Sequence, residues 1–214
     1  MNNKTACIIL ADGFEESEAI VTADVLKRLN INIIFAGLNS LKVRGTHDFY
    51  IMSDKLLNEI SVNDFDALIL PGGLPGTINL RNSPQVTELL QQSYQSGKIC
   101  AAICAAPIVL HDAQIAQNKT LTGYPECEQL ALSPNLKFTG KATETDGLII
   151  TAKGMGKAAE FAFAIAAKLG VSAEEINQVG QNAFITINGS KKPGWLDTII
   201  ALPLNKPFCF FPLI

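Results

Sequence analysis

The 214-residue sequence has few histidines, no Cys-x-x-Cys pair and no excess of basic charge, and each shortage excludes a class of protein. The only two histidines are His47 and His111, so the pattern of paired cysteines and histidines that binds structural zinc is missing. We therefore expect no metal and no other cofactor. With 17 basic and 20 acidic residues and no basic run, the net charge of −3 argues against nucleic acid as the main partner.

Long hydrophobic runs are also missing. No stretch reaches the roughly 20 apolar residues that a membrane span requires. The first apolar run has only about five residues and ends in acids, unlike a signal peptide. An odd number of cysteines at irregular spacing favours reduced thiols over a disulfide framework. We expect a cytoplasmic protein without a membrane partner, whose five cysteines are Cys7, Cys100, Cys104, Cys127 and Cys209.

What is present is apolar sequence in short, regularly placed runs. Hydrophobic residues make up 48% of the chain and charged residues 17%, which is enough for a large core. Runs typical of buried strands alternate with helical patterns, and this order predicts an α/β fold with a doubly wound, mostly parallel sheet and helices on both faces. The predicted strands are 5–11, 31–38, 66–73, 98–103, 119–123 and 147–152, and the predicted helices are 15–29, 84–97, 154–170 and 172–184.

The end of the chain differs from the rest. We interpret residues 1–188 as a single domain and 189–214 as a C-terminal extension. The extension is apolar but broken by prolines, so it could be a loose tail, a partner-binding arm or a wrap over the domain. The prolines are Pro193, Pro203, Pro207 and Pro212.

Cys104 directly follows the predicted strand 98–103 and precedes a short helical segment that begins near Pro107. Strand, reactive residue and helix is the order of a nucleophile elbow, which needs small residues two places to either side; here these are Ala102 and Ala106. A helix start favours a thiolate through its dipole. The alternative is that Cys104 only fills space, which is how we interpret Cys100 inside the strand.

Glu18 is the acid of the first helix that should face inward. It lies on an apolar stripe at helical spacing, whereas Glu15 and Glu16 fall off the stripe and are typical first-turn acids. Burial would raise the pKa of Glu18, so it could donate a hydrogen bond to a thiolate or carry a proton. The alternative is a carboxyl that caps a neighbouring loop. The stripe consists of Glu18, Val21, Thr22, Val25 and Leu29.

A glycine turn ends the predicted strand 66–73. Gly72 and Gly73 allow the backbone to approach another loop closely and to aim N–H groups into a site. Together with the N–H of Ala105 they would form an oxyanion hole, although an ordinary strand-ending turn has the same sequence. The glycines at 154–156 lack the lysine and hydroxyl residue of a phosphate-binding loop.

Together these segments resemble the ThiJ/PfpI superfamily, also written DJ-one/PfpI, and most closely its YajL-like branch. The matching segments are 9–18, 70–73, 101–107, 122–125 and 146–166. The resemblance implies a flavodoxin-like fold, a homodimer and an oxidation-sensitive Cys104 beside a protonated Glu18. It also implies oxyanion N–H groups from Gly73 and Ala105.

In function, the resemblance implies glyoxalase or deglycase chemistry on methylglyoxal or its glycated adducts, with a hemithioacetal at Cys104 and proton transfer by Glu18. The alternative, ranked behind this chemistry, is an oxidation-sensing chaperone that binds unfolded clients without significant turnover. Older family labels are protease and thiamine-biosynthesis (thiazole monophosphate) protein. A relative of the fold with an inert thiol is a further alternative.

The chain departs from its relatives at three positions. Ala105 stands where the protease-like branch has a histidine after the cysteine, which argues against a Cys-His protease. Tyr124 stands where some relatives have a histidine, and it could still donate a hydrogen bond. His47 stands where the family has an arginine near the dimer interface, whereas Arg28 is retained. His111 follows Cys104 along the same helix, so we interpret it as a surface or helix-end residue.

Overall fold

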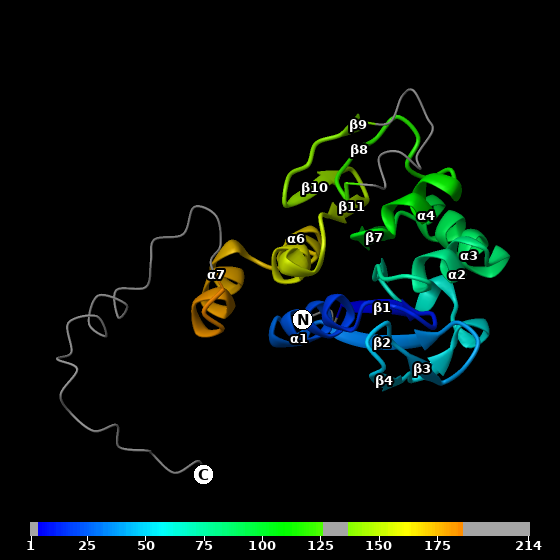
Figure 1. Ribbon diagram of the computed structural model, residues 1–214. Helices are drawn as coiled ribbons and strands as arrows, with labels where there is room; N and C mark the ends of the chain where they lie inside the picture. Colours follow the sequence, from blue (N-terminus) through cyan, green and yellow to red (C-terminus); the bar gives the residue numbers. More distant parts are fainter. Residues whose placement is uncertain (1–3, 126–136, 186–214) are drawn as a thin grey trace, which may run out of the picture.

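The computed structural model describes residues 4–125 and 137–185, and its centre is a seven-stranded sheet in the order β10-β11-β7-β6-β1-β2-β5 (Figure 1). Neighbouring strands are parallel except for β10 and β11. This confirms the predicted doubly wound, mostly parallel sheet. The strands are β1 (Thr5–Leu10), β2 (Asn32–Gly37), β5 (Lys55–Leu56), β6 (Ala67–Leu70), β7 (Ile99–Ile103), β10 (Thr143–Asp146) and β11 (Ile149–Ala152).

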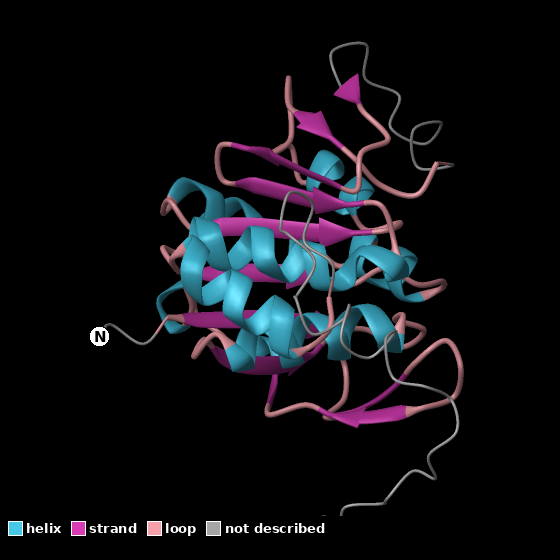
Figure 2. Cartoon of the chain, turned by 90° about the vertical axis from the view of Figure 1, so that its left-hand side faces the viewer, coloured by secondary structure: helices cyan, strands magenta, loops and turns pink. Residues whose placement is uncertain are grey.

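Helices cover both faces of the sheet, and each side has its own core (Figures 1 and 2). One core is built on α1 (Glu16–Arg28), α6 (Ala158–Lys168) and α7 (Ala173–Asn182). The other is built on α2 (Gly76–Arg81), α3 (Pro84–Gln95) and α4 (Pro107–Asp112). Short 3-10 turns are η1 (Leu57–Glu59), η2 (Val62–Asp64) and η3 (Met155–Lys157). No helix among the described residues is both long and apolar enough to cross a membrane.

The continuous apolar runs become central strands because both of their faces are buried. In β1, Ile8 and Leu10 pack into the core under α1 and α6, while Cys7 and Ile9 pack into the core under α3 and α4. Successive side chains of a strand point to opposite faces, so a strand covered on both sides must be apolar throughout. The same reason explains why all five residues of β7 are buried.

Helix ends follow the predicted signals. Ser83 caps α3 by accepting a hydrogen bond from the Val86 N–H, and Pro84 occupies the first turn, where its missing N–H costs nothing. Gly97, just after α3, has a φ of +74°, a conformation that glycine adopts without strain.

Several features differ from the sequence-based prediction, which did not include α2, β5 and β10. The predicted strand 119–123 is only β8 (Thr120–Leu121), which pairs with β9 (Lys137–Phe138) outside the main sheet. The predicted helix 154–170 begins as η3 because Gly154 is extended, and α6 starts only at Ala158. The hairpin of β3 (Lys42–Arg44) and β4 (Tyr50–Met52) was not predicted.

Val21 is a further correction, since its residue is 38% exposed although the stripe placed it inward. The other members of the stripe, including Glu18, are buried. The extension 189–214 lies outside the described residues, so its assignment as a separate segment stays a prediction.

Candidate active site

The carboxyl ends of three neighbouring strands lie at the same edge of the sheet, and the predicted site residues follow these strands. From β1 the chain moves to β2 on one side and returns as β6 on the other, so the strand order reverses at β1. Ligands of doubly wound folds bind at the carboxyl ends of strands at such a point. Glu18 follows β1, Gly72 follows β6 and Cys104 follows β7.

Cys104 has the sharp turn that the elbow predicts. Its φ is +62°, in the left-handed region that residues with a Cβ seldom adopt. Two backbone hydrogen bonds hold it there: its N–H donates to the Ala152 carbonyl over 2.9 Å, and its carbonyl accepts from the Tyr124 N–H over 2.7 Å. Ala102 and Ala106 are fully buried beside this turn. The thiol therefore stands on a fixed backbone between β7 and α4.

The other described cysteines are unsuited to thiol chemistry. Cys7 and Cys100 are completely buried, and burial raises the pKa of each thiol to about 12. A thiol with such a pKa carries almost no thiolate near neutral pH. Cys104 is the only described cysteine that is not fully buried. The complete burial of Cys100 and the raised pKa of its thiol agree with its interpretation as a packing residue.

Glu18 lies beside Cys104 and is only 1% exposed. Its Oε2 accepts a hydrogen bond from the Gly72 N–H over 2.8 Å, and the Cys104 side chain forms a second hydrogen bond with the carboxyl. Burial raises the pKa of Glu18 to about 7, although both hydrogen bonds work in the opposite direction. Glu18 thus fixes the turn at Gly72 through a hydrogen bond, and its carboxyl, with a pKa near neutrality, lies next to the thiol.

Gly72 fills the space between these two side chains. A Cβ at this position would lie 2.7 Å from the Cys104 Cβ and 2.8 Å from Glu18 Oε2. Its N–H is used by Glu18, so Gly72 does not supply an oxyanion donor as the sequence suggested.

We expect Gly72→Ala to destabilise the fold by about 1–3 kcal/mol, because the added methyl group overpacks the junction. The rate of thiol alkylation at Cys104 should also change, since the methyl group displaces either the thiol or the carboxyl. Thermal unfolding and alkylation kinetics measure the two effects. Gly156→Ala is the matched control, because a Cβ there meets nothing within 4 Å. Equal behaviour of the two variants would contradict this packing.

Gly73 adopts a φ of +91°, and a Cβ there would lie 2.4 Å from the Glu15 backbone nitrogen. Only glycine fits this position. No described group accepts a hydrogen bond from the Gly73 N–H. This donor suits a ligand oxygen, whereas the role predicted for the Ala105 N–H stays a prediction.

The sequence reasoning missed Gly154, which follows β11. A Cβ at Gly154 would lie 3.9 Å from the Cys104 sulfur, so this residue forms part of the wall around the thiol. The glycine run was visible in the sequence, but only the parallel pairing of β11 with β7 brings it to Cys104. Tyr124 contacts Cys104 through its backbone N–H, and the residue is 48% exposed.

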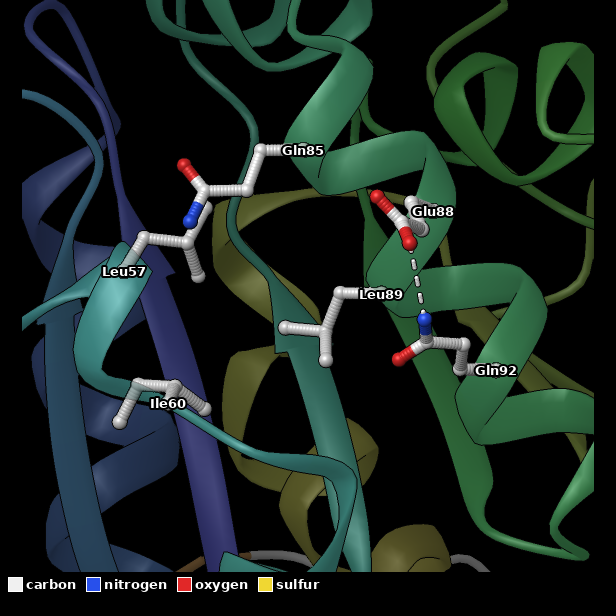
Figure 3. Close-up of a pocket in the computed structure, with 6 residues that line it drawn as sticks. All are labelled: Leu57, Ile60, Gln85, Glu88, Leu89 and Gln92. Carbon is white, nitrogen blue, oxygen red and sulfur yellow. Dashed lines mark hydrogen bonds between the residues drawn. The ribbon is translucent and has the colours of Figure 1, made fainter.

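A pocket of about 180 Å³ lies between η1 and α3 and is a second place where a ligand could bind (Figure 3). Its apolar floor is formed by Leu57, Ile60 and Leu89, and the Gln92 amide donates to Glu88 Oε1 over 3.0 Å. Its lining contains no cysteine, serine or histidine that could act as a nucleophile. The thiol site therefore remains the candidate active site.

The two residues predicted for a dimer interface lie on the surface of the single chain. Arg28 pairs with Asp24 over 2.8 Å, and its side chain is 50% exposed. His47 has a 64% exposed side chain and pairs with Glu16 over 3.0 Å. His111 lies in the last turn of α4 and contacts Asp112 over 3.0 Å. The hydrogen-bond partners of the two imidazole rings are Glu16 for His47 and Asp112 for His111.

Comparison with known proteins agrees with this geometry. Residues 4–168 match the model of the DJ-1/PfpI family. Protein dj-1beta of Drosophila melanogaster is 37% identical over 187 residues, which cover 87% of this chain and all of the relative. Its crystal structure superposes with a TM-score of 0.81 at 38% identity, over 86% of this chain and 100% of that one.

Two further relatives carry informative names. A Caenorhabditis elegans protein named glutathione-independent glyoxalase DJR-1.2 is 34% identical over 163 residues, covering 76% of this chain and 87% of its own. A structure described as Toxoplasma gondii DJ-1, oxidized, has a TM-score of 0.79 at 26% identity, covering 86% and 100% of the two chains. The narrower YajL-like assignment stays a prediction. On the family match and the full-length likeness to dj-1beta, the chain belongs to the DJ-1/PfpI family.

Proposed function

We propose that this chain is a cysteine-dependent stress-protection enzyme that converts methylglyoxal, or its glycated adducts, by glyoxalase or deglycase chemistry. The observation that carries the proposal is the pairing of a thiol on a strained turn with a buried carboxyl. A relative named as a glutathione-independent glyoxalase supports the same reaction class. A cytoplasmic location is part of the proposal.

In the proposed reaction, the Cys104 sulfur forms a bond to the aldehyde carbon as the C=O π bond breaks, and the proton given up by the thiol ends on the aldehyde oxygen, which gives a hemithioacetal. The Gly73 N–H, with the predicted Ala105 N–H, stabilises the charge that develops on this oxygen. Glu18 then removes the proton from the former aldehyde carbon and returns a proton to the neighbouring carbon. The hydroxyl proton passes to the former ketone oxygen, and the product is a lactoyl thioester. Water cleaves the thioester, releasing lactate and the free thiol.

Glu18 suits this role because its pKa of about 7 lets it accept and donate protons near neutral pH. The test is lactate formation from methylglyoxal by the purified chain, followed by proton NMR without added glutathione. Lactate formation above the rate in buffer supports the proposal. A rate equal to that in buffer contradicts it.

A second candidate is an oxidation-sensing chaperone without significant turnover, which binds unfolded clients. The favouring observation is that Cys104 alone among the described cysteines is not fully buried, next to an acid that can stabilise a sulfinate by hydrogen bonding. The oxidised state named for the Toxoplasma gondii relative is consistent with this candidate. Replacement of Glu18 by glutamine distinguishes the two candidates, because glutamine cannot carry a proton but can still donate a hydrogen bond.

We also propose that the chain forms a homodimer through α1 and the β3–β4 hairpin. These elements expose large apolar side chains at Ile20, Phe49 and Met52, which are 40%, 67% and 64% exposed. Exposed apolar groups of this kind mark interaction surfaces. Light scattering after size-exclusion chromatography should give twice the chain mass. Phe49→Asp should give monomers, unlike the control Glu88→Lys on α3; a monomeric wild-type protein would contradict the proposal.

A further inference from the structure

The first turn of α1 and the β3–β4 loop bring together three groups that the proposed reaction does not use. His47 Nδ1 lies 3.0 Å from Glu16 Oε2 and 3.6 Å from Glu15 Oε2. One oxygen or nitrogen atom of each residue lies within 4.8 Å of the other two. This cluster of Glu15, Glu16 and His47 is called the EEH cluster below.

Glu16 lies in the first turn of α1, as the sequence predicted, but its burial was not expected from its place off the apolar stripe. The residue is 8% exposed because the loop after β3 folds over it. Gly45 permits this contact, since a Cβ there would lie 2.1 Å from Glu16 Oε1. Glu16 Oε1 accepts hydrogen bonds from the backbone N–H groups of His47 and Phe49 over 2.7 and 3.4 Å.

In each of the two carboxylates, one oxygen accepts hydrogen bonds from the protein and the other oxygen faces the imidazole of His47. Glu16 Oε1 is fixed by the loop backbone, and Glu15 Oε1 accepts a hydrogen bond from the Ser17 hydroxyl over 2.7 Å. Both Oε2 atoms face His47 Nδ1. Protein groups that orient ligands in this way are typical of metal sites, where they fix the geometry before the ion binds.

An ion pair alone accounts for only part of this geometry. The imidazole Nδ1 carries at most one hydrogen, which serves Glu16, and 3.6 Å to Glu15 is too long for a hydrogen bond. One imidazolium charge also leaves the two carboxylates with a net charge of about −1. Two ligands of a tetrahedral zinc ion, each at about 2.0–2.2 Å, lie roughly 3.4 Å apart. The observed distances of 3.0 and 3.6 Å bracket this value.

We propose that the EEH cluster binds a divalent transition-metal ion such as Zn²⁺ through Glu15, Glu16 and His47, with water as the fourth ligand. An imidazole ligand selects Zn²⁺, Ni²⁺ or Cu²⁺ over Mg²⁺ and Ca²⁺, which prefer oxygen alone. The sequence-based expectation of no metal considered only paired cysteines and histidines. It missed this site because the third ligand lies about 30 residues away along the chain.

His47→Arg separates a metal site from an ion pair. Arginine retains a positive charge that can pair with both carboxylates, but it does not ligate a metal ion near neutral pH. Binding of ZnCl₂ is measured by isothermal titration calorimetry on the full chain after treatment with EDTA and dialysis. The measurements use a Cys104→Ser background, so that the reactive thiol does not contribute.

We expect one Zn²⁺ per chain, with an affinity at least 10-fold weaker after His47→Arg and after His47→Ala. The absorption spectrum of the Co²⁺-substituted protein should show d–d bands without a thiolate charge-transfer band. His111→Gln is the matched control and should retain the affinity. Absence of binding, or equal affinity before and after His47→Arg, would overturn the proposal and leave an ion pair.

Discussion

Replacement of Cys104 by serine is expected to lower kcat/KM for methylglyoxal by roughly 10³-fold or more, to the rate measured without protein. Serine fits the same turn, so the backbone hydrogen bonds to Ala152 and Tyr124 should persist. A hydroxyl next to Glu18 has a much higher pKa than a thiol and is a far weaker nucleophile. Lactate formation by the two proteins, compared side by side, measures the loss.

Cys100→Ala is the control for this prediction. Cys100 is fully buried within β7, four residues before Cys104, so its replacement tests whether any loss of a sulfur atom in this strand reduces activity. We expect activity within about twofold of wild type, with a modest loss of stability from the small cavity. If Cys104→Ser kept its turnover while Cys100→Ala lost it, the assignment of the nucleophile would be wrong.

The central strands could be predicted from the sequence, because a strand that is buried on both faces must be a continuous run of apolar residues. β1, β6 and β7 are continuous apolar runs, and each lies within a predicted range. The site residues could also be predicted, since Glu18, Gly72 and Cys104 each follow one of these strands. In a parallel sheet, the carboxyl ends of adjacent strands meet at the same edge.

Features that depend on contacts between distant segments could not be predicted in this way. Strands β3 and β4 have three residues each, which is too short for a periodic pattern to stand out, and the hairpin exposes Phe49 and Met52. Without the hairpin, nothing in the sequence indicates that Glu16 is buried. Gly154 reaches Cys104 only through the register of β11 on β7.

Glu18→Gln should distinguish the enzyme from the redox sensor. Glutamine can still accept the Gly72 N–H and donate a hydrogen bond to an oxidised sulfur, but it does not ionise. We expect kcat for methylglyoxal to fall by roughly 10²–10⁴-fold, the usual contribution of a general acid or base. Oxidation of Cys104 to the sulfinate by peroxide, followed by intact mass, should survive. An unchanged kcat would exclude Glu18 as the proton carrier.

The same variant should also change how stability depends on pH. The unfolded Glu18 ionises near pH 4.5 and the folded one near pH 7, so between these values the folded state holds the extra proton. The free energy of unfolding of the wild type should therefore fall by roughly 3 kcal/mol as the pH rises through this window, and then level off. Glu18→Gln should lack this part of the slope. Urea unfolding at pH 5 and pH 8, with EDTA to remove metal ions, measures the difference. If the stability of both proteins fell equally with pH, the Glu18 carboxyl would ionise at its ordinary pKa. Glu18 would then not be able to exchange protons near neutral pH as the proposed reaction requires.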